Sequence, residues 1–179
     1  MSKALTSPLE YVASKIRRPV WLDGQSAEPI GLNNILGTHG TSIETIIALA
    51  RTGVFPNDRQ DPDLQGTFHL TPNLRNKLWK KTDFSSDVEL AISKIGYPHP
   101  IEISTDFATS ATESKNSSGV VVTFGKQILG LIREVDIDEM NEEPEIVLSE
   151  APPLEAVKGI YPVDVFSAVA LASQIDKLR

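Results

Sequence analysis

The chain contains no cysteine, which excludes disulfide bonds, thiolate nucleophiles and cysteine-ligated zinc. It has only three histidines, His39, His69 and His99, and their spacing matches no zinc motif, so we expect no metal site. No apolar run approaches the length that spans a bilayer, and no apolar stretch follows the basic residues near the N-terminus as it would in a secretory signal. We therefore expect no membrane association and a cytoplasmic location, either in the cell of origin or in a host cytosol after delivery.

Basic residues are fewer than acidic ones, with 17 Lys and Arg against 24 Asp and Glu and a net charge of −7. This balance disfavours broad electrostatic binding to nucleic acids or anionic lipids. It leaves room for a local basic patch. One dense cluster exists at Arg75, Lys77, Lys80 and Lys81, and the simplest interpretation of it is the solvated end of a helix.

Several common nucleotide-binding and catalytic motifs are absent. The sequence has no Gly-x-Gly-x-x-Gly and no P-loop, so neither a Rossmann site nor a Walker site is indicated. It also has no Gly-x-Ser-x-Gly, which disfavours acyl transfer by a serine nucleophile of the α/β-hydrolase type.

The length of 179 residues suits one domain with one sizeable core. We expect a single domain over residues 1–179, with its core at about 35–161, an N-terminal helix at 8–16 and a C-terminal helix at 163–178. Helices and strands alternate early and strands predominate later, an order typical of an α+β fold.

The clearest local pattern covers about twenty residues. Residues 35–40 suit a strand that ends in a tight turn, and Thr41-Ser42 supplies a helix N-cap. The following helix presents an apolar face, and Gly53 lies just past its last turn, where a left-handed residue is favoured.

Other segments are assigned by their apolar patterns and turn residues. We expect strands at 66–71, 101–104, 120–124, 128–132, 145–148 and 156–161. We expect helices at 74–79 and 87–95 and a polar, mobile stretch at 105–118.

The turn His39-Gly40-Thr41, which ends a strand and precedes a helix, resembles the first motif of the ADP-ribosyltransferases of the diphtheria-toxin and poly-ADP-ribose-polymerase type. Three further motifs of that family follow in order: the strand Gly66–Thr71, the strand Gly119–Val122 and a late strand that carries a glutamate, Pro144–Leu148. The resemblance covers roughly residues 35–161. It implies split mixed or antiparallel β-sheets with flanking helices, and NAD as the substrate.

The resemblance also implies roles for the first motif. The backbone of Gly40 would hold the nicotinamide carboxamide, because a glycine allows close approach to a planar amide. His39 would hydrogen-bond a ribose hydroxyl of NAD and count among the catalytic residues. Thr41 would add a hydroxyl contact or cap the helix.

The same resemblance makes Glu145 the catalytic carboxylate. Cleavage of the nicotinamide–ribose bond develops positive charge on the ribose, and a carboxylate near the 2′-hydroxyl stabilises that charge. Glu143 lies two residues earlier, on the same face of a regular strand. Glu143 and Glu150 are the alternative acids.

The second motif departs from the family pattern. His69 occupies the position where the family has tyrosine, and an imidazole can also stack or hydrogen-bond. The family stacks a further aromatic side chain on the nicotinamide, and Trp79 is the nearby aromatic residue that the sequence offers. We include both among the expected NAD-binding residues.

These expectations describe an NAD-dependent mono-ADP-ribosyltransferase that modifies a macromolecule, with a protein acceptor favoured over a nucleic acid. Three alternatives stay open. They are an inactive relative that binds a nucleotide or a protein, an RNA 2′-phosphotransferase-like enzyme, and an unrelated α+β binding domain. The phosphotransferase needs several basic residues around its pocket, and this acidic chain has few.

Overall fold

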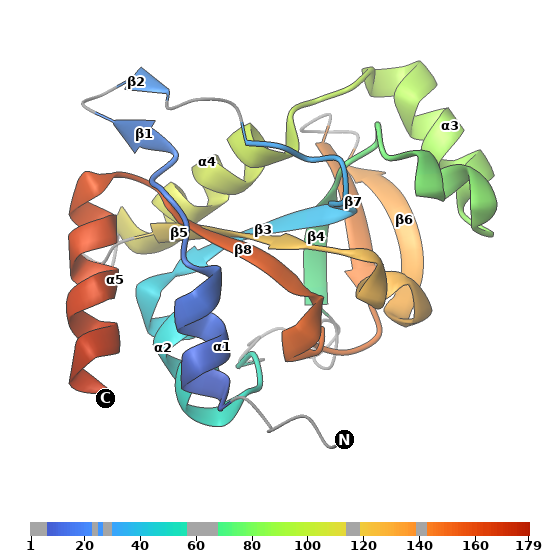
Figure 1. The fold of residues 1–179 in the computed structure, drawn as a ribbon. Coiled ribbons are helices and arrows are strands. Elements are labelled where there is room, and N and C mark those ends of the chain that lie inside the picture. Colours follow the sequence, from blue (N-terminus) through green and yellow to red (C-terminus); the bar gives the residue numbers. More distant parts are fainter. Residues whose placement is uncertain (1–6, 23–24, 27–29, 57–67, 114–118, 139–142) are drawn as a thin grey trace.

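The structure is a computed structural model that describes residues 7–22, 25–26, 30–56, 68–113, 119–138 and 143–179 (Figure 1). Its helices are α1 (Pro8–Lys15), α2 (Ile43–Thr52), α3 (Ser85–Ile95), α4 (Pro100–Glu113) and α5 (Val165–Lys177). Its strands are β1 (Trp21–Leu22), β2 (Gln25–Ser26), β3 (Gly37–Ser42), β4 (Phe68–Pro72), β5 (Gly119–Phe124), β6 (Ile132–Asp138), β7 (Glu143–Leu148) and β8 (Val157–Pro162). Three short 3-10 helices complete the described elements: η2 (Lys77–Lys81), η3 (Lys126–Leu131) and η4 (Leu154–Ala156).

Six strands form one antiparallel sheet in the order β6-β7-β4-β3-β5-β8. This confirms the α+β class and the antiparallel sheet with flanking helices. The two central strands, β3 and β4, pair at only two positions, Gly37 with Pro72 and Thr38 with Thr71. Beyond these two pairs, β3 remains paired with β5 and β4 remains paired with β7, so the sheet separates between β3 and β4.

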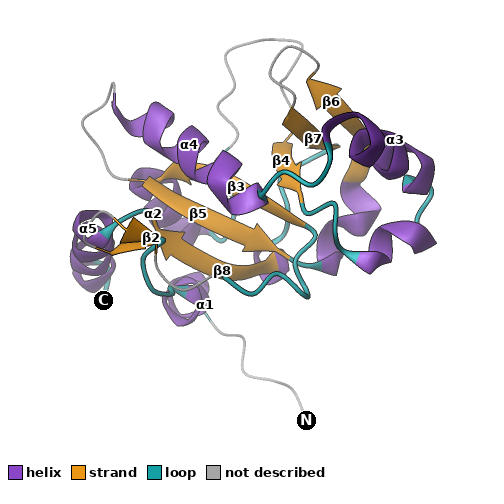
Figure 2. Ribbon diagram, turned by 90° about the horizontal axis from the view of Figure 1, so that it is seen from above, coloured by secondary structure: helices purple, strands orange, loops and turns teal. Residues whose placement is uncertain are grey.

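Helices cover both faces of the β3–β5–β8 half. α4 packs on one face, against β3 and β5, whereas α1, α2 and α5 gather on the opposite face (Figures 1 and 2). Successive side chains of β5 point to opposite faces of the sheet. On one face Val120, Val122 and Phe124 enter the main core, and on the other Val121 packs beside Ile101 of α4. Every residue of β5 is buried, which agrees with its continuous apolar run.

The helix of the β3–α2 unit agrees with its expected pattern, but the tight turn expected at the end of residues 35–40 is wrong, because β3 continues through His39, Gly40 and Thr41 in register with β5. The side chain of Ser42 accepts a hydrogen bond from the backbone N–H of Thr45 and caps α2. Gly53 ends the helix in the left-handed conformation, with φ of 76°. The cap is therefore Ser42, and Thr41 belongs to the strand.

The helix α4 replaces the strand expected at 101–104 and much of the polar stretch expected at 105–118, of which residues 114–118 lie outside the described part. Its buried side chains recur at helical spacing, at Ile101, Ser104, Thr105 and Ala108. Two of these four are hydroxyl residues and one is alanine, so the apolar periodicity that would predict a helix is missing. The Thr105 hydroxyl donates to the carbonyl of Ile101, 2.6 Å away, which satisfies it inside the interface.

The strand expected at 128–132 is also wrong. Residues 126–131 form η3, which carries the chain from β5 across the end of the sheet to β6 at the far edge. β6 was not expected, although its apolar residues Val135 and Ile137 alternate with charged ones, which is the pattern of a half-buried strand. The remaining expected strands are present with small shifts of their ends, and the expected start of β4, Gly66 and Thr67, lies outside the described residues.

Within the described residues, no helix is both long and apolar enough to cross a membrane.

Gly40 of β3 is the point where sheet and helix approach most closely. A Cβ atom built there would lie 1.9 Å from the Ser104 carbonyl oxygen and 2.8 Å from the Ala108 nitrogen, both in the backbone of α4. No side-chain movement can relieve a contact with backbone atoms. The glycine is thus required by the packing of α4 on β3.

We expect Gly40→Ala to lower the free energy of unfolding by about 1–3 kcal/mol, because β3 and α4 must separate. Urea denaturation would measure it. The matched control is Gly130→Ala, since nothing lies within 4 Å of a Cβ at Gly130, and it should change stability by less than about 0.5 kcal/mol. Equal stability of the two variants would contradict the close packing.

Candidate functional site

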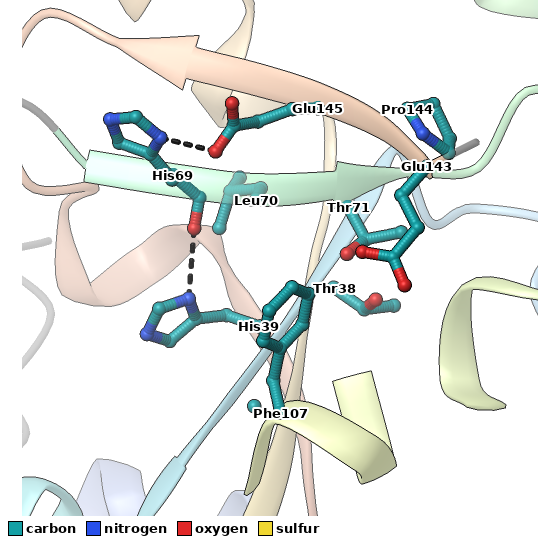
Figure 3. Close-up of a pocket in the computed structure, with 10 residues that line it drawn as sticks. Thr38, His39, His69, Leu70, Thr71, Phe107, Glu143, Pro144 and Glu145 are labelled. Carbon is teal, nitrogen blue, oxygen red and sulfur yellow. Dashed lines mark hydrogen bonds and ion pairs between the residues drawn. The ribbon is translucent and has the colours of Figure 1, made fainter. Parts of the chain in front are cut away.

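The opening between β3 and β4 holds a cavity of about 310 Å³. Its wall combines β3, β4, α4 and the first residues of β7 (Figure 3). The residues that line it are Thr38, His39, Gly40, His69, Leu70, Thr71, Phe107, Glu143, Pro144 and Glu145. The cavity therefore brings together residues from three of the four motifs that the sequence singled out.

His39 bridges the opening. Its Nδ1 lies 2.9 Å from the backbone carbonyl oxygen of His69 on β4. A carbonyl can only accept, so Nδ1 carries the proton and Nε2 of the neutral ring is an acceptor. The ring also packs on Phe68, with 4.5 Å between centroids, which fixes its orientation.

His69 holds Glu145. The two side chains come from neighbouring strands, because His69 is opposite Val147 and Glu145 lies two residues away on the same face of β7. The His69 Nδ1 donates to Oε1 of Glu145 (Figure 3). The His69 side chain is 15% exposed and that of Glu145 is 41% exposed, so the histidine anchors a carboxylate that a ligand can still reach. Among the described residues, Oε2 of Glu145 has no hydrogen-bond partner.

Glu143 and Glu150, the alternative acids, have different positions. Glu143 is the first residue of β7, pairs in register with Asp138, and lines the same cavity as Glu145. Glu150 follows the end of β7, is exposed, and is not among the described residues of the cavity wall. The cavity therefore holds two carboxylates, and that of Glu145 is bonded to His69.

Phe107 is a cavity residue that sequence reasoning missed. It belongs to α4, its ring points into the cavity beside His39 and Thr38, and it is 53% exposed (Figure 3). An aromatic side chain this exposed in the wall of a cavity offers a planar apolar surface to a ligand. The sequence could indicate it only if the segment had been assigned as a helix, because its small buried side chains conceal that periodicity.

The other residues in and beside the first motif differ in whether they line the cavity. Gly40 lines the cavity, but the close neighbour of its Cα is the backbone of α4. Thr41 is not among the described residues that line the cavity. Thr38 lines the cavity, donates to the carbonyl of Pro100 and bonds the Ser104 hydroxyl at 2.6 Å, and so fixes the start of α4.

Trp79 lies elsewhere. It is 1% exposed, packs in the core between η2 and α3, and donates its indole N–H to the carbonyl of Asn73 at 2.9 Å. It lines a different cavity from His39. The expectation that it stacks on a ligand with His39 and His69 is therefore corrected: its ring is part of the structural core.

The groups in the cavity can stabilise positive charge. In the described parts of the chain no three His, Asp or Glu side chains come close enough to hold a metal ion. The cavity instead offers an oriented carboxylate, an imidazole acceptor and an aromatic face. These groups can bind a polar ring system and stabilise positive charge that develops beside Glu145.

Comparisons of the chain with protein-family models, with curated proteins and with solved structures found no match.

We expect Trp79→Phe to lower the free energy of unfolding by about 1–3 kcal/mol, because the smaller ring leaves part of a fully buried site unfilled and the Asn73 carbonyl keeps only one of its two donors, the N–H of Asn76. Urea denaturation tests this, with Trp21→Phe as the control, since Trp21 is 38% exposed in β1. If Trp79 contacted the ligand instead, the variant would bind NAD more weakly at unchanged stability.

Proposed function

We propose that this protein is an NAD-dependent ADP-ribosyltransferase whose reaction takes place in the cavity between β3 and β4. The observation that carries the proposal is the meeting of His39, His69 and Glu145 there. These residues lie far apart in sequence, and the family resemblance assigns all three to the NAD site. Their strands are neighbours in the order β7-β4-β3, which supports one shared site.

Glu145 is the residue for the chemical step. Breaking the nicotinamide–ribose bond leaves positive charge on the ribose, and a fixed carboxylate next to it lowers the barrier. Oε1 is held by His69, which leaves Oε2 for the ribose or for the attacking group. A carboxylate that is already oriented does not have to reorganise during the reaction.

His39 and Phe107 are the binding residues. The Nε2 of His39 is suited to accept a hydrogen bond from a ribose hydroxyl, because Nδ1 donates to the backbone of β4. The Phe107 ring takes the stacking role that the sequence gave to Trp79. Glu143 adds a second carboxylate that can orient the acceptor.

We expect Glu145→Gln to reduce nicotinamide release from NAD by about 10²–10³-fold while the protein stays folded, because the amide keeps the shape and loses the charge. Glu150→Gln is the matched control and should keep the wild-type rate, since Glu150 lies outside the cavity wall. Transfer from labelled NAD in a host lysate reports the acceptor in the same experiment.

The outcomes separate the assignment from the function. Full activity of Glu145→Gln would refute the role of this glutamate. A wild-type protein that binds NAD without cleaving it would be a nucleotide-binding relative, which is the role favoured if the His69 bond keeps Glu145 from the ribose. A wild-type protein that neither binds nor cleaves NAD refutes the proposal.

We expect Phe107→Ala to raise KM for NAD by roughly tenfold, with a smaller effect on kcat, because one stacking contact of about 1–3 kcal/mol is lost. Steady-state kinetics measure both constants. Val169→Ala on α5 is the control, since Val169 is also exposed, at 65%, and is not among the residues that line the cavity. An unchanged KM in Phe107→Ala would remove Phe107 from the binding site.

A further inference from the structure

A second, larger cavity lies at the end of the sheet where β3 begins and β4 ends. Its volume is about 660 Å³. The residues that line it come from the chain before β3, from the segment after β4 that includes η2, and from η3. They are Leu32, Asn33, Asn34, Asn73, Arg75, Asn76, Lys77, Leu78, Lys81 and Lys126. We call this cavity the basic groove.

The basic groove is positively charged in an acidic protein. Four cations line it, at Arg75, Lys77, Lys81 and Lys126, and all four are exposed. No Asp or Glu is among its described lining residues, and among the described residues none of these four cations forms an ion pair with a carboxylate. With a net charge of −7 for the chain, such a cluster without counter-charges indicates an anionic ligand.

The walls of the groove are fixed by side-chain amides. The Asn73 Nδ2 donates to the carbonyls of Leu32 and Ile35, at 3.1 and 2.9 Å. The Asn76 Nδ2 lies 3.0 Å from the Ile35 carbonyl, and its Oδ1 accepts from the N–H of Leu78. These bonds join the chain before β3 to η2, so the cations are presented by a preorganised surface.

An aromatic platform adjoins the groove. The guanidinium of Arg75 lies 4.3 Å from the ring centroid of Tyr97, which is 49% exposed. Arg75, Asn76 and Lys77 also line the neighbouring cavity that contains Tyr97, together with Lys80 and Glu89, so the two hollows adjoin beside η2. Guanidinium and phenol planes are surfaces on which nucleic-acid bases stack.

The groove lies close to the cavity of the candidate site. Thr38 and Thr71 line that cavity, Asn73 lines the groove, and the single pair Gly37–Pro72 separates them along the strands. Two residues of strand span roughly 7 Å, about the spacing of adjacent nucleotides in an extended strand. The two hollows are therefore neighbours at the ends of the same strands.

We propose that the basic groove binds single-stranded nucleic acid through its phosphates, with bases stacked on the Arg75–Tyr97 platform. That this strand is also the acceptor rests on the proposed function. Its phosphates would occupy the groove, where four cations line the wall, and a base or sugar of the strand would reach the neighbouring cavity.

Other anionic partners fit less well. A lipid surface is flat, whereas these cations line a hollow, and none of the large exposed apolar side chains in the described part of the chain lines the groove. An acidic protein surface would use the cations and leave the Arg75–Tyr97 platform without a role. The combination of spaced cations, amides and a stacking surface is that of a single-strand site.

The test is fluorescence anisotropy of a labelled single strand of about twelve nucleotides, as RNA and as DNA, titrated with full-length protein in the absence of NAD. The test variant is Lys77→Gln/Lys81→Gln/Lys126→Gln. The control is Arg51→Gln/Lys177→Gln/Arg179→Gln, which removes the same charge from exposed positions outside the groove. Urea denaturation checks that both remain folded.

Wild type should bind the strand, and the groove variant should bind it roughly tenfold or more weakly than the control does. The slope of log Kd against log salt should fall by about two in the groove variant, because about three phosphate contacts are lost. Tyr97→Ala should weaken binding with no change in that slope, since stacking releases no counterions.

Absence of wild-type binding, or an equal loss in the groove and control variants, would refute the groove. Groove-dependent binding to vesicles of anionic lipid but not to the strand would also refute it. The Glu145→Gln variant should bind the strand as wild type does. If wild type binds the strand but does not cleave NAD, the groove proposal is supported and the proposed function is refuted. If wild type cleaves NAD but does not bind the strand, the groove proposal alone is refuted.

Discussion

The separation of β3 from β4 after two residue pairs is the constraint on which the rest of the site depends. A continuous ladder would pair the backbone of β3 with that of β4 and leave no cavity between them. The opening leaves the His69 carbonyl without a partner in β3, and a buried carbonyl without a hydrogen bond costs free energy of folding. The His39 side chain supplies the donor across the opening, at 2.9 Å. The hydrogen bond that satisfies the His69 carbonyl is therefore also the one that orients the His39 imidazole.

The helix α4 keeps the two halves of the sheet in this arrangement. Its backbone rests on Gly40, and its first turn is bonded to the Thr38 hydroxyl. This close approach needs small side chains on both partners, which explains the serine, threonine and alanine on the buried face of α4. The same helix then carries Phe107 into the cavity wall. One packing requirement thus accounts for a glycine, for an inconspicuous helix and for an aromatic surface at the site.

The two cavities divide opposite charges between them. The cavity between β3 and β4 contains Glu143 and Glu145, while the basic groove at the ends of the same strands contains four cations. A net charge of −7 conceals this division, since it averages over the whole surface. Local fields are set by the side chains that the fold brings together, and these decide what each cavity can bind.

The sequence by itself determined the local features whose causes lie within a few residues. The α2 cap and its left-handed glycine, the buried β5 strand and the C-terminal helix follow from caps, turns and apolar runs, and the structure has them. It also singled out His39, His69 and Glu145. It could not predict α4, because the buried face of that helix is small and polar. The alternation of apolar and charged residues in β6 could have indicated that strand.

Only the tertiary structure decided which of the selected residues share a cavity. It joined Glu145 to His69 through the register of β4 and β7, removed Trp79 to the core, and added Phe107 from a distant helix. It also gathered Lys126 with the cluster at 75–81. These relations join positions far apart in the chain, and strand order and helix packing fix them, so no local pattern of residues contains them.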